Sequence, residues 1–383
     1  MMNQLEKPLQ DFIARELEPR WEKLNRRDDE ILREILQASA PLGLSLAIIP
    51  EELSGPGFPP QAAAYILEEL AASVPAFATI MGLHYSGLAL ILSLPDPGQK
   101  RQILAPLTGS GDNPRLVSPA LWEDPTPRDL RDLPASLSTR LEHNLITGGK
   151  TAVIFGEYTQ GLLGLARDQE EELSWVLFSP RDPNLKVRNL PEPMGLRLCP
   201  FAHLEFDKIP VAASWPANPL DHLISVDGFE AAIAVGIAQG AFNRTFANAL
   251  ERCQGGKPIC DQDPVRGILA DRGIAIEAAR ALAYRSVSWG WDQHAPETEV
   301  GASAFAAELA PKIVLDCIQL LGRYGYMKDH RLERFFRDAK TYEFMIARAG
   351  LRKSWYITEM IAGSRGQQIR VGADPAEGEN QTS

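Results

Sequence analysis

The spacing of apolar residues divides the chain into three segments, and the first segment has helical spacing. Leu5, Leu9 and Phe12 begin one apolar stripe, with the three-to-four-residue repeat of an amphipathic helix. A second, more continuously apolar helix is expected at residues 76–92 and ends before Pro95, because proline breaks the helical hydrogen-bond ladder. The pattern predicts a layer of helices over the first 110 or so residues.

A second pattern begins at Pro114, where prolines recur and the apolar runs become short. Val153-Ile154-Phe155 and the run 175–178 are rich in β-branched and aromatic residues, and Leu204-Glu205-Phe206 alternates between two faces. Such runs are typical of β-strands, and Gly148-Gly149 supplies a turn between them. This segment therefore predicts a small antiparallel β-barrel domain.

Helical spacing returns at Val226 and continues through Phe229, Ile233 and Ile237. Long amphipathic helices must bury their apolar stripes against one another, which indicates a four-helix bundle. The predicted fold is therefore mainly α with a central β-domain. Its boundaries are an N-terminal helical domain at 1–114, the β-domain at 115–215, the C-terminal bundle at 216–363 and a polar, disordered tail at 364–383.

Composition and charge narrow the function classes. The net charge of −11 argues against nucleic acid or an anionic membrane as the main partner. No apolar run looks long enough to span a membrane, and no signal peptide is visible. The four cysteines have no Cys-x-x-Cys spacing, so a reducing compartment and a cytoplasmic localisation are expected. The six histidines are scattered, and no metal site is expected.

Several short motifs occur in a fixed order along the chain. They include Pro50–Gly57, Glu68–Ala71, the turn Gln319–Tyr326 and the pair Arg337-Asp338. Together with the order of helices, β-domain and bundle, they resemble the acyl-CoA dehydrogenase family. The resemblance implies α,β-dehydrogenation of an acyl-CoA thioester, FAD as cofactor, and an electron-transfer flavoprotein as electron acceptor. It also implies a homo- or hetero-oligomer, dimeric or tetrameric, formed through the C-terminal bundle.

The same resemblance assigns five residues to the flavin. Trp122 and Ile154 occupy positions where the family has threonine hydroxyls at the flavin ring, and Arg252 begins a loop that reaches a partner subunit's pyrophosphate. Gln319 and Gly322 belong to the turn that approaches the flavin. Because neither Trp122 nor Ile154 carries a hydroxyl, the occupancy of FAD stays open at this point.

The family's catalytic carboxylate is missing from its usual positions. Counted from Lys340, the usual position falls on Ile346 or, with a gap, on Ala349, and the alternative position on the first bundle helix is Val226. Glu343 is the remaining candidate for the base that removes the substrate α-proton. Its other interpretation is a solvated or ion-paired carboxylate on the turn after Lys340.

Three functions therefore stay open. The first is an acyl-CoA dehydrogenase-like flavoprotein with Glu343 as base. The second is a non-catalytic or FAD-poor homologue that serves as the structural subunit of a hetero-oligomer with an active paralogue. The third is a flavin monooxygenase, which does not need the base. The acyl-chain specificity is not encoded in any motif of this sequence.

Overall fold

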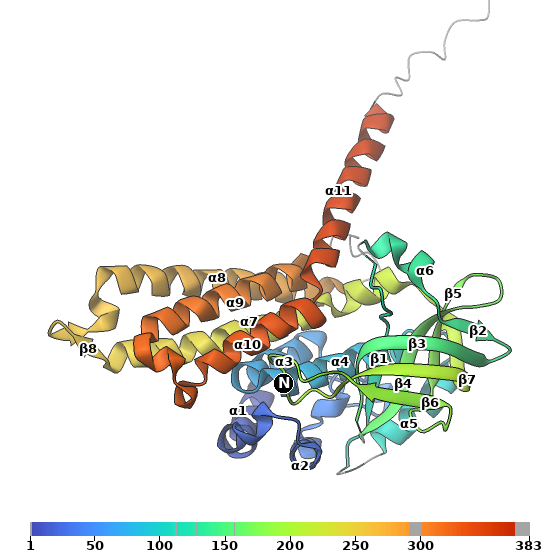
Figure 1. Ribbon diagram of the computed structural model, residues 1–383, viewed down its shortest axis with the longest axis horizontal. Helices are drawn as coiled ribbons and strands as arrows, with labels where there is room; N and C mark the ends of the chain where they lie inside the picture. Colours follow the sequence, from blue (N-terminus) through green and yellow to red (C-terminus); the bar gives the residue numbers. More distant parts are fainter. Residues whose placement is uncertain are drawn as a thin grey trace, which may run out of the picture.

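The N-terminal part is a layer of helices that packs beneath the bundle and against the sheet (Figure 1). The computed structural model describes residues 2–109, 111, 113–127, 129–156, 158–290 and 301–371. The predicted stripe is buried, since Leu9 and Leu17 have no exposed surface. The helices of this part are α1 (Met2–Phe12), α2 (Asp29–Ser39), α3 (Pro60–Ser73), α4 (Pro75–Leu92) and α5 (Pro97–Thr108).

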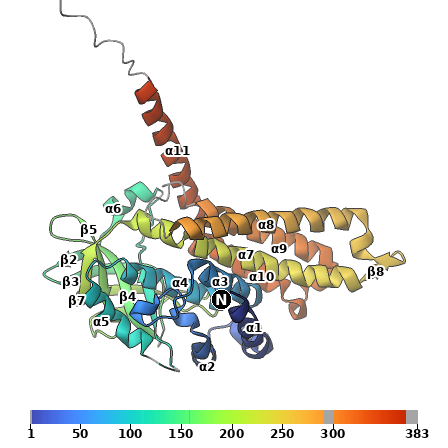
Figure 2. The same ribbon diagram turned by 180° about the vertical axis from the view of Figure 1, so that it is seen from behind.

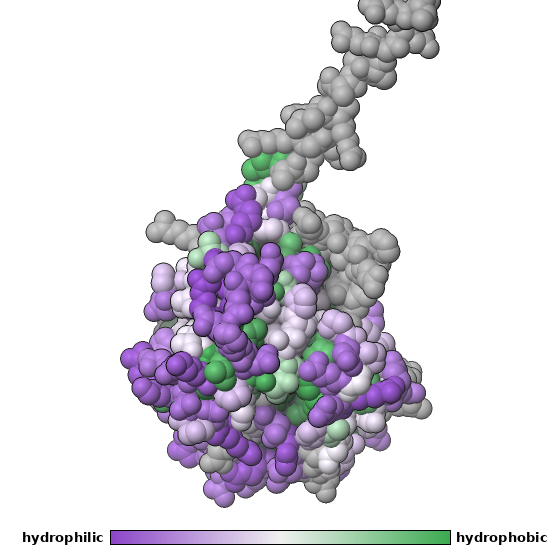
Figure 3. All heavy atoms as spheres, turned by 90° about the vertical axis from the view of Figure 1, so that its right-hand side faces the viewer, coloured by the Kyte–Doolittle hydropathy of each residue, from purple (hydrophilic) through white to green (hydrophobic). Residues whose placement is uncertain are grey.

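The middle part is a seven-stranded sheet at one end of the molecule, with a mostly polar outer face (Figure 3). β1 pairs with β4 in parallel, and only Arg140 and Arg167 join β2 to β4. The sheet is thus mixed, not purely antiparallel as predicted, and these pairings do not confirm the barrel. The elements are β1 (Leu116–Ala120), α6 (Leu133–Ser136), β2 (Arg140–Glu142), β3 (Leu145–Ile154), β4 (Thr159–Arg167), β5 (Leu173–Phe178), β6 (Leu185–Asn189) and β7 (Phe201–Pro216).

The C-terminal part is the predicted helical bundle, and a last helix, α11, projects from it (Figures 1 and 2). Residues 364–371 of the expected tail are helical in α11, and residues 372–383 lie outside the described part of the chain. The elements are α7 (Pro219–Glu251), the two-residue strands β8 (Cys253–Gln254) and β9 (Lys257–Pro258), α8 (Asp263–Gly290), α9 (Gly301–Leu321), α10 (Leu332–Met345) and α11 (Ala349–Val371).

Helix α7 is the central element, because it contacts both the bundle and the N-terminal layer. A Cβ at Gly236 or Gly240 would lie 2.2 Å from a backbone oxygen of α3, so only glycine permits this close crossing. The expectation that no apolar run could span a membrane needs correction. α4 and α7 are long and apolar enough, but 89% and 83% of their apolar windows are buried inside the protein.

Candidate functional site

A small cavity lies where the sheet, the N-terminal layer and the bundle meet. Its free volume is about 40 Å³, room for only a few water molecules. The lining combines an apolar wall with a cluster of ionisable side chains. The lining residues are Leu83, Ser86, Pro119, Leu121, Trp122, Leu130, Ala152, His222, Leu223, Val226, Glu230, Met345, Ile346, Arg348, Leu351 and Arg352.

Trp122 is held at the cavity by the buried carboxylate beside it. Glu123 accepts hydrogen bonds from the backbone N–H and the hydroxyl of both Ser138 and Thr139. Lys150 Nζ lies 2.6 Å from Glu123 Oε1 and is fully buried. Burial alone would raise the pKa of Glu123, but Lys150 and the hydroxyl donors lower it overall. Glu123 is therefore charged and fixes the backbone next to Trp122.

An irregularity in strand β3 brings a second backbone segment to the cavity. The register between β3 and β7 shifts between Lys150 and Val153, and Ala152 has a φ of 55°, a left-handed conformation unusual for alanine. The Thr151 N–H donates to the Trp122 carbonyl at 2.8 Å. A bulge of this kind redirects a side chain, and here Ala152 lines the cavity.

Three charged side chains form a buried cluster on the bundle side. Arg352 donates to Asp227 Oδ1 at 3.0 Å and also to the carboxylate of Glu230. Asp227 is fully buried, whereas 14% of the Glu230 side chain is exposed, and Glu230 lines the cavity. Two carboxylates share one guanidinium. Burial, opposed by Arg352 and reinforced by Asp227, raises the pKa of Glu230 to about 7.

Arg348 lies across the cavity from the apolar wall and is poorly paired. Its guanidinium carbon lies 4.3 Å from the centre of the Trp122 ring, and its Nη1 donates a hydrogen bond to Thr126 Oγ1 at 3.3 Å. Within the part of the chain that the structure describes, its buried Nε has no hydrogen-bond partner, and its φ is 45°. Burial lowers the pKa of Arg348 to about 10, although Glu230 opposes the shift. Such a strained, under-bonded cation indicates a ligand-binding role.

A neutral histidine completes the polar lining. His222 Nε2 lies 3.0 Å from Ser86 Oγ, and its ring packs edge-on against Trp175 at 5.6 Å. Burial, with Arg352 nearby, lowers the pKa of His222 to about 3. His222 is therefore uncharged at neutral pH and serves as a hydrogen-bonding group.

The structure brings only some of the predicted site residues to this cavity. Trp122 lines it, and so does Ile346, which occupies the expected position of the base. Ile154 is 3% exposed and belongs to the hydrophobic core. Glu343 is not among the cavity-lining residues; its Oε2 lies 2.6 Å from Lys340 Nζ on the same helix. The role of Glu343 as base stays a prediction.

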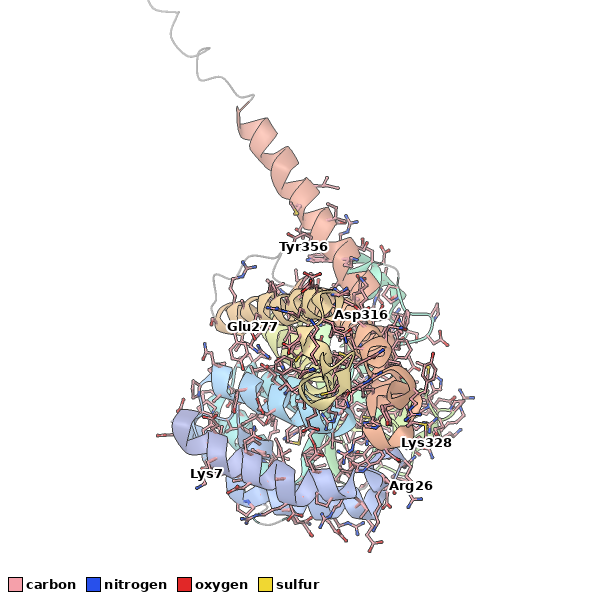
Figure 4. All side chains as sticks on the ribbon, turned by 90° about the vertical axis from the view of Figure 1, so that its left-hand side faces the viewer. Lys7, Arg26, Glu277, Asp316, Lys328 and Tyr356 are labelled. Carbon is pink, nitrogen blue, oxygen red and sulfur yellow. The ribbon has the colours of Figure 1, made fainter. Side chains whose placement is uncertain are left out.

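The other predicted residues gather at the far end of the bundle, seen end-on in Figure 4. Arg252 donates to the Leu321 carbonyl at 3.2 Å, next to Gly322, whose φ of 60° suits glycine. Gln319 is exposed two residues before that carbonyl. Arg252 follows directly after α7 and lies 22 residues beyond Glu230, which corresponds to about 33 Å along the helix. The two groups cannot contact the same small molecule from one chain.

Sequence patterns did not reveal Glu230, Arg348 and Arg352. Glu230 lies between two apolar positions of the α7 stripe, and it is the α11 helix that places Arg352 opposite it. Arg348 lies just after the missing base position. A buried stripe interrupted by Asp227 and Glu230 was the available signal, because an acidic residue is rarely buried without a partner.

Comparisons with known proteins agree with this architecture. Residues 2–110 match the sequence model of the acyl-CoA dehydrogenase N-terminal domain, and residues 230–346 match that of the C-terminal domain. A cyclohexane-1-carbonyl-CoA dehydrogenase of Geobacter metallireducens is 34% identical over 51% of this chain and 55% of its own length. The probable acyl-CoA dehydrogenase YngJ of Bacillus subtilis is 28% identical over 88% of this chain and 91% of its own.

Solved structures share the fold. The butyryl-CoA dehydrogenase of Megasphaera elsdenii superposes with a TM-score of 0.81 at 21% identity, covering 96% of this chain and 98% of that one. An acyl-CoA dehydrogenase of Bacillus anthracis, solved with FAD, has a TM-score of 0.83 at 20% identity and covers 98% of this chain and 68% of that one.

Proposed function

Because this chain belongs to the acyl-CoA dehydrogenase family, we propose that it is an FAD-dependent enzyme that oxidises a CoA thioester between its α and β carbons. In this proposal the electrons pass to an electron-transfer flavoprotein. One observation carries the proposal furthest: the cavity at the junction of sheet and bundle contains buried ionisable groups. Burying such groups costs stability unless they are paired, and proteins gather them mainly at functional sites.

The residues present fit the family's cofactor in two places. At the cavity, the unpaired Arg348 Nε is a donor without an acceptor, and a flavin ring edge or a carbonyl would supply one. At the bundle end, Arg252 and the turn at Gly322 offer a cation and a left-handed backbone, which suit a diphosphate. FAD, when bound, would supply the acceptor for the two electrons.

The chain's own residues perform the remaining tasks. Leu83, Leu121 and Leu351 line the cavity and exclude water, which strengthens every electrostatic interaction inside. Arg348 would orient an acceptor oxygen of the bound ligand. His222 is neutral and donates or accepts a hydrogen bond without adding charge. Trp122 must turn aside to admit a flavin-sized ring, because the free volume is about 40 Å³.

The proposal includes an oligomer. The cavity and the bundle-end residues of one chain are about 33 Å apart along α7, longer than an extended FAD, so a second copy would complete each site. The comparisons do not favour the alternative of a non-catalytic structural subunit, since both family domains are present. A cytoplasmic localisation remains part of the proposal, supported by four free cysteines.

The test is an absorption spectrum of the purified full chain, followed by anaerobic addition of acyl-CoA thioesters. We expect close to one FAD per chain and bleaching of the flavin band by at least one thioester. An electron-transfer flavoprotein should then reoxidise the chain's flavin. A chain that stays colourless after incubation with excess FAD would contradict the proposed function.

A further inference from the structure

A second carboxylate is better placed than Glu343 for proton abstraction. Among the residues that the structure describes, Glu230 is the one carboxylate in the cavity lining. It lies one helical turn beyond Val226 on α7, so both side chains point to the same side of the helix. Ile346, at the usual position of the base, lines the same cavity from the other side.

The surroundings of Glu230 hold its carboxylate at the cavity surface. Arg352 Nη2 donates to Glu230 Oε2, and the Tyr342 hydroxyl donates to the Glu230 backbone carbonyl at 2.9 Å. The side chain is 14% exposed, although the helix around it is buried. A carboxylate fixed by one donor keeps lone pairs available for a proton.

We propose that Glu230 is the general base of this enzyme and removes the α-proton of the bound CoA thioester. The inference rests on the proposed function for its substrate class. In the step, the Cα–H bond breaks and the proton moves to a Glu230 oxygen. The electron pair remains on the substrate as the thioester enolate, so a carboxylate and a thioester become a carboxylic acid and an enolate.

Several charged or titratable groups face this carboxylate. They are Asp227 and His222 on α7, Tyr342 on α10, Arg352 on α11 and Arg348 just before α11. Burial and Asp227 raise the pKa of Glu230, Arg352 and Arg348 oppose them, and the result is about 7. A base with this pKa is poised for proton transfer near neutral pH. Exchange should therefore increase with pH and level off above about pH 7.

The experiment follows exchange of the α-protons for deuterium in D₂O by NMR, with butyryl-CoA and cyclohexane-1-carbonyl-CoA as probes. The full-length chain is measured as wild type and as the variants Glu230→Gln, Glu230→Asp, Glu343→Gln and Glu308→Gln. Glu308 is the matched control, because its carboxylate pairs with Lys353 at 2.9 Å outside the cavity. Circular dichroism and thioester binding by calorimetry show whether each variant is folded and competent to bind.

We expect Glu230→Gln to lose exchange by about 10²–10⁴-fold, the usual contribution of a general base. The aspartate variant should retain part of the activity, and Glu308→Gln all of it. Wild-type exchange that survives in folded Glu230→Gln, or that is lost in Glu343→Gln instead, overturns the proposal. So does a wild type that binds thioester without exchange. Because exchange needs no electron acceptor, flavin bleaching by the wild type tests the proposed function separately.

Discussion

At the scale of single residues, Trp122 is the position at which the resemblance predicts a threonine hydroxyl. Its indole lines the cavity beside Arg348, whose guanidinium carbon lies 4.3 Å from the ring centre. A cation over an aromatic face contributes about 0.5–2 kcal/mol. That contact stabilises the ligand-free arrangement, so it competes with any ring that must enter the cavity.

Replacing Trp122 with threonine should therefore increase FAD affinity. The change opens the cavity and adds one hydroxyl, and a hydrogen bond contributes about 0.5–1.5 kcal/mol, or about a 2–10-fold lower Kd. Flavin bound per chain after titration with FAD measures the effect. The matched control is Trp21→Thr, since Trp21 carries Arg331 over its ring at 4.5 Å outside the cavity. Weaker FAD binding by a folded Trp122→Thr variant would contradict this interpretation.

Arg348 carries a second prediction at this scale. Arg348→Met keeps most of the side-chain volume but removes a buried cation with an unpaired Nε. The melting temperature should change little, because the loss of the contact with Trp122 offsets the relief of burying a cation whose Nε lacks a hydrogen bond. Its ligand affinity should fall about 10–100-fold, the equivalent of one charge-assisted hydrogen bond. Thermal unfolding measures the melting temperature, and calorimetric titration measures the ligand affinity. The control is Arg131→Met, because the Arg131 side chain is exposed.

Glu230 should make stability depend on pH in a defined window. Its pKa is about 7 in the folded chain and 4.5 when solvated. Between those values the folded chain retains a proton that the unfolded chain has lost, so the free energy of unfolding falls as pH rises. Relative to wild type, Glu230→Gln should gain up to about 3 kcal/mol between pH 4.5 and 7. Urea unfolding at several pH values measures this difference, and a constant difference would refute it.

At the scale of secondary-structure elements, Asp227 joins four helices. From α7 it accepts hydrogen bonds from Ser286 on α8, from Ala302 and Ser303 on α9, and from Arg352 on α11. Burial raises the pKa of Asp227, although Arg352 and the serine hydroxyls oppose the shift. This network anchors the base of α11, where Tyr356 lies close to the bundle (Figure 4).

Removing one member of this network should cost more than removing two. Arg352→Met leaves Asp227 and Glu230 without their cation, and breaking a buried ion pair costs about 3–5 kcal/mol. The double variant Asp227→Asn with Arg352→Met should recover part of that loss, because Asp227 and Arg352 lose their charges together while only the Glu230 carboxylate remains. Denaturant unfolding of Asp227→Asn, of Arg352→Met and of the double variant completes the double-mutant cycle. Additive losses in the double variant would show that the pair is not coupled.

How well the sequence predicts each structural feature depends on how far apart in the chain the interacting residues lie. The N-terminal helical layer was visible in the sequence because apolar periodicity is a local signal, as with Leu9 and Phe12. The mixed sheet was not predicted from the sequence, because β1 pairs in parallel with β4, a segment about 40 residues away in the chain, and local spacing does not reveal which strands pair. The charged cluster also escaped prediction, since Glu230 and Arg352 are 122 positions apart and meet only after folding.

At the scale of the whole molecule, the two halves of the proposed cofactor site lie at opposite ends of α7. The bundle also exposes large apolar side chains. Phe246, Leu250, Ile274, Phe305 and Leu315 are 41–69% exposed. Exposed apolar groups of this size mark protein contacts, so the bundle is the expected interface. In the proposed oligomer, a second copy bound at this surface contributes its Arg252 to this chain's cofactor site.

Charge introduced on that surface should therefore weaken both assembly and cofactor binding. The side chain of Leu250 is 51% exposed in the single chain. The variant Leu250→Asp should therefore leave the monomer folded and disrupt the interface. Light scattering should show a shift to the monomer mass, and FAD bound per chain should fall at least tenfold at micromolar protein. The matched control is Met194→Asp on the β-domain, 49% exposed. If monomeric Leu250→Asp retained full FAD, each chain would hold its cofactor alone, and the argument from the 33 Å separation along α7 would fail.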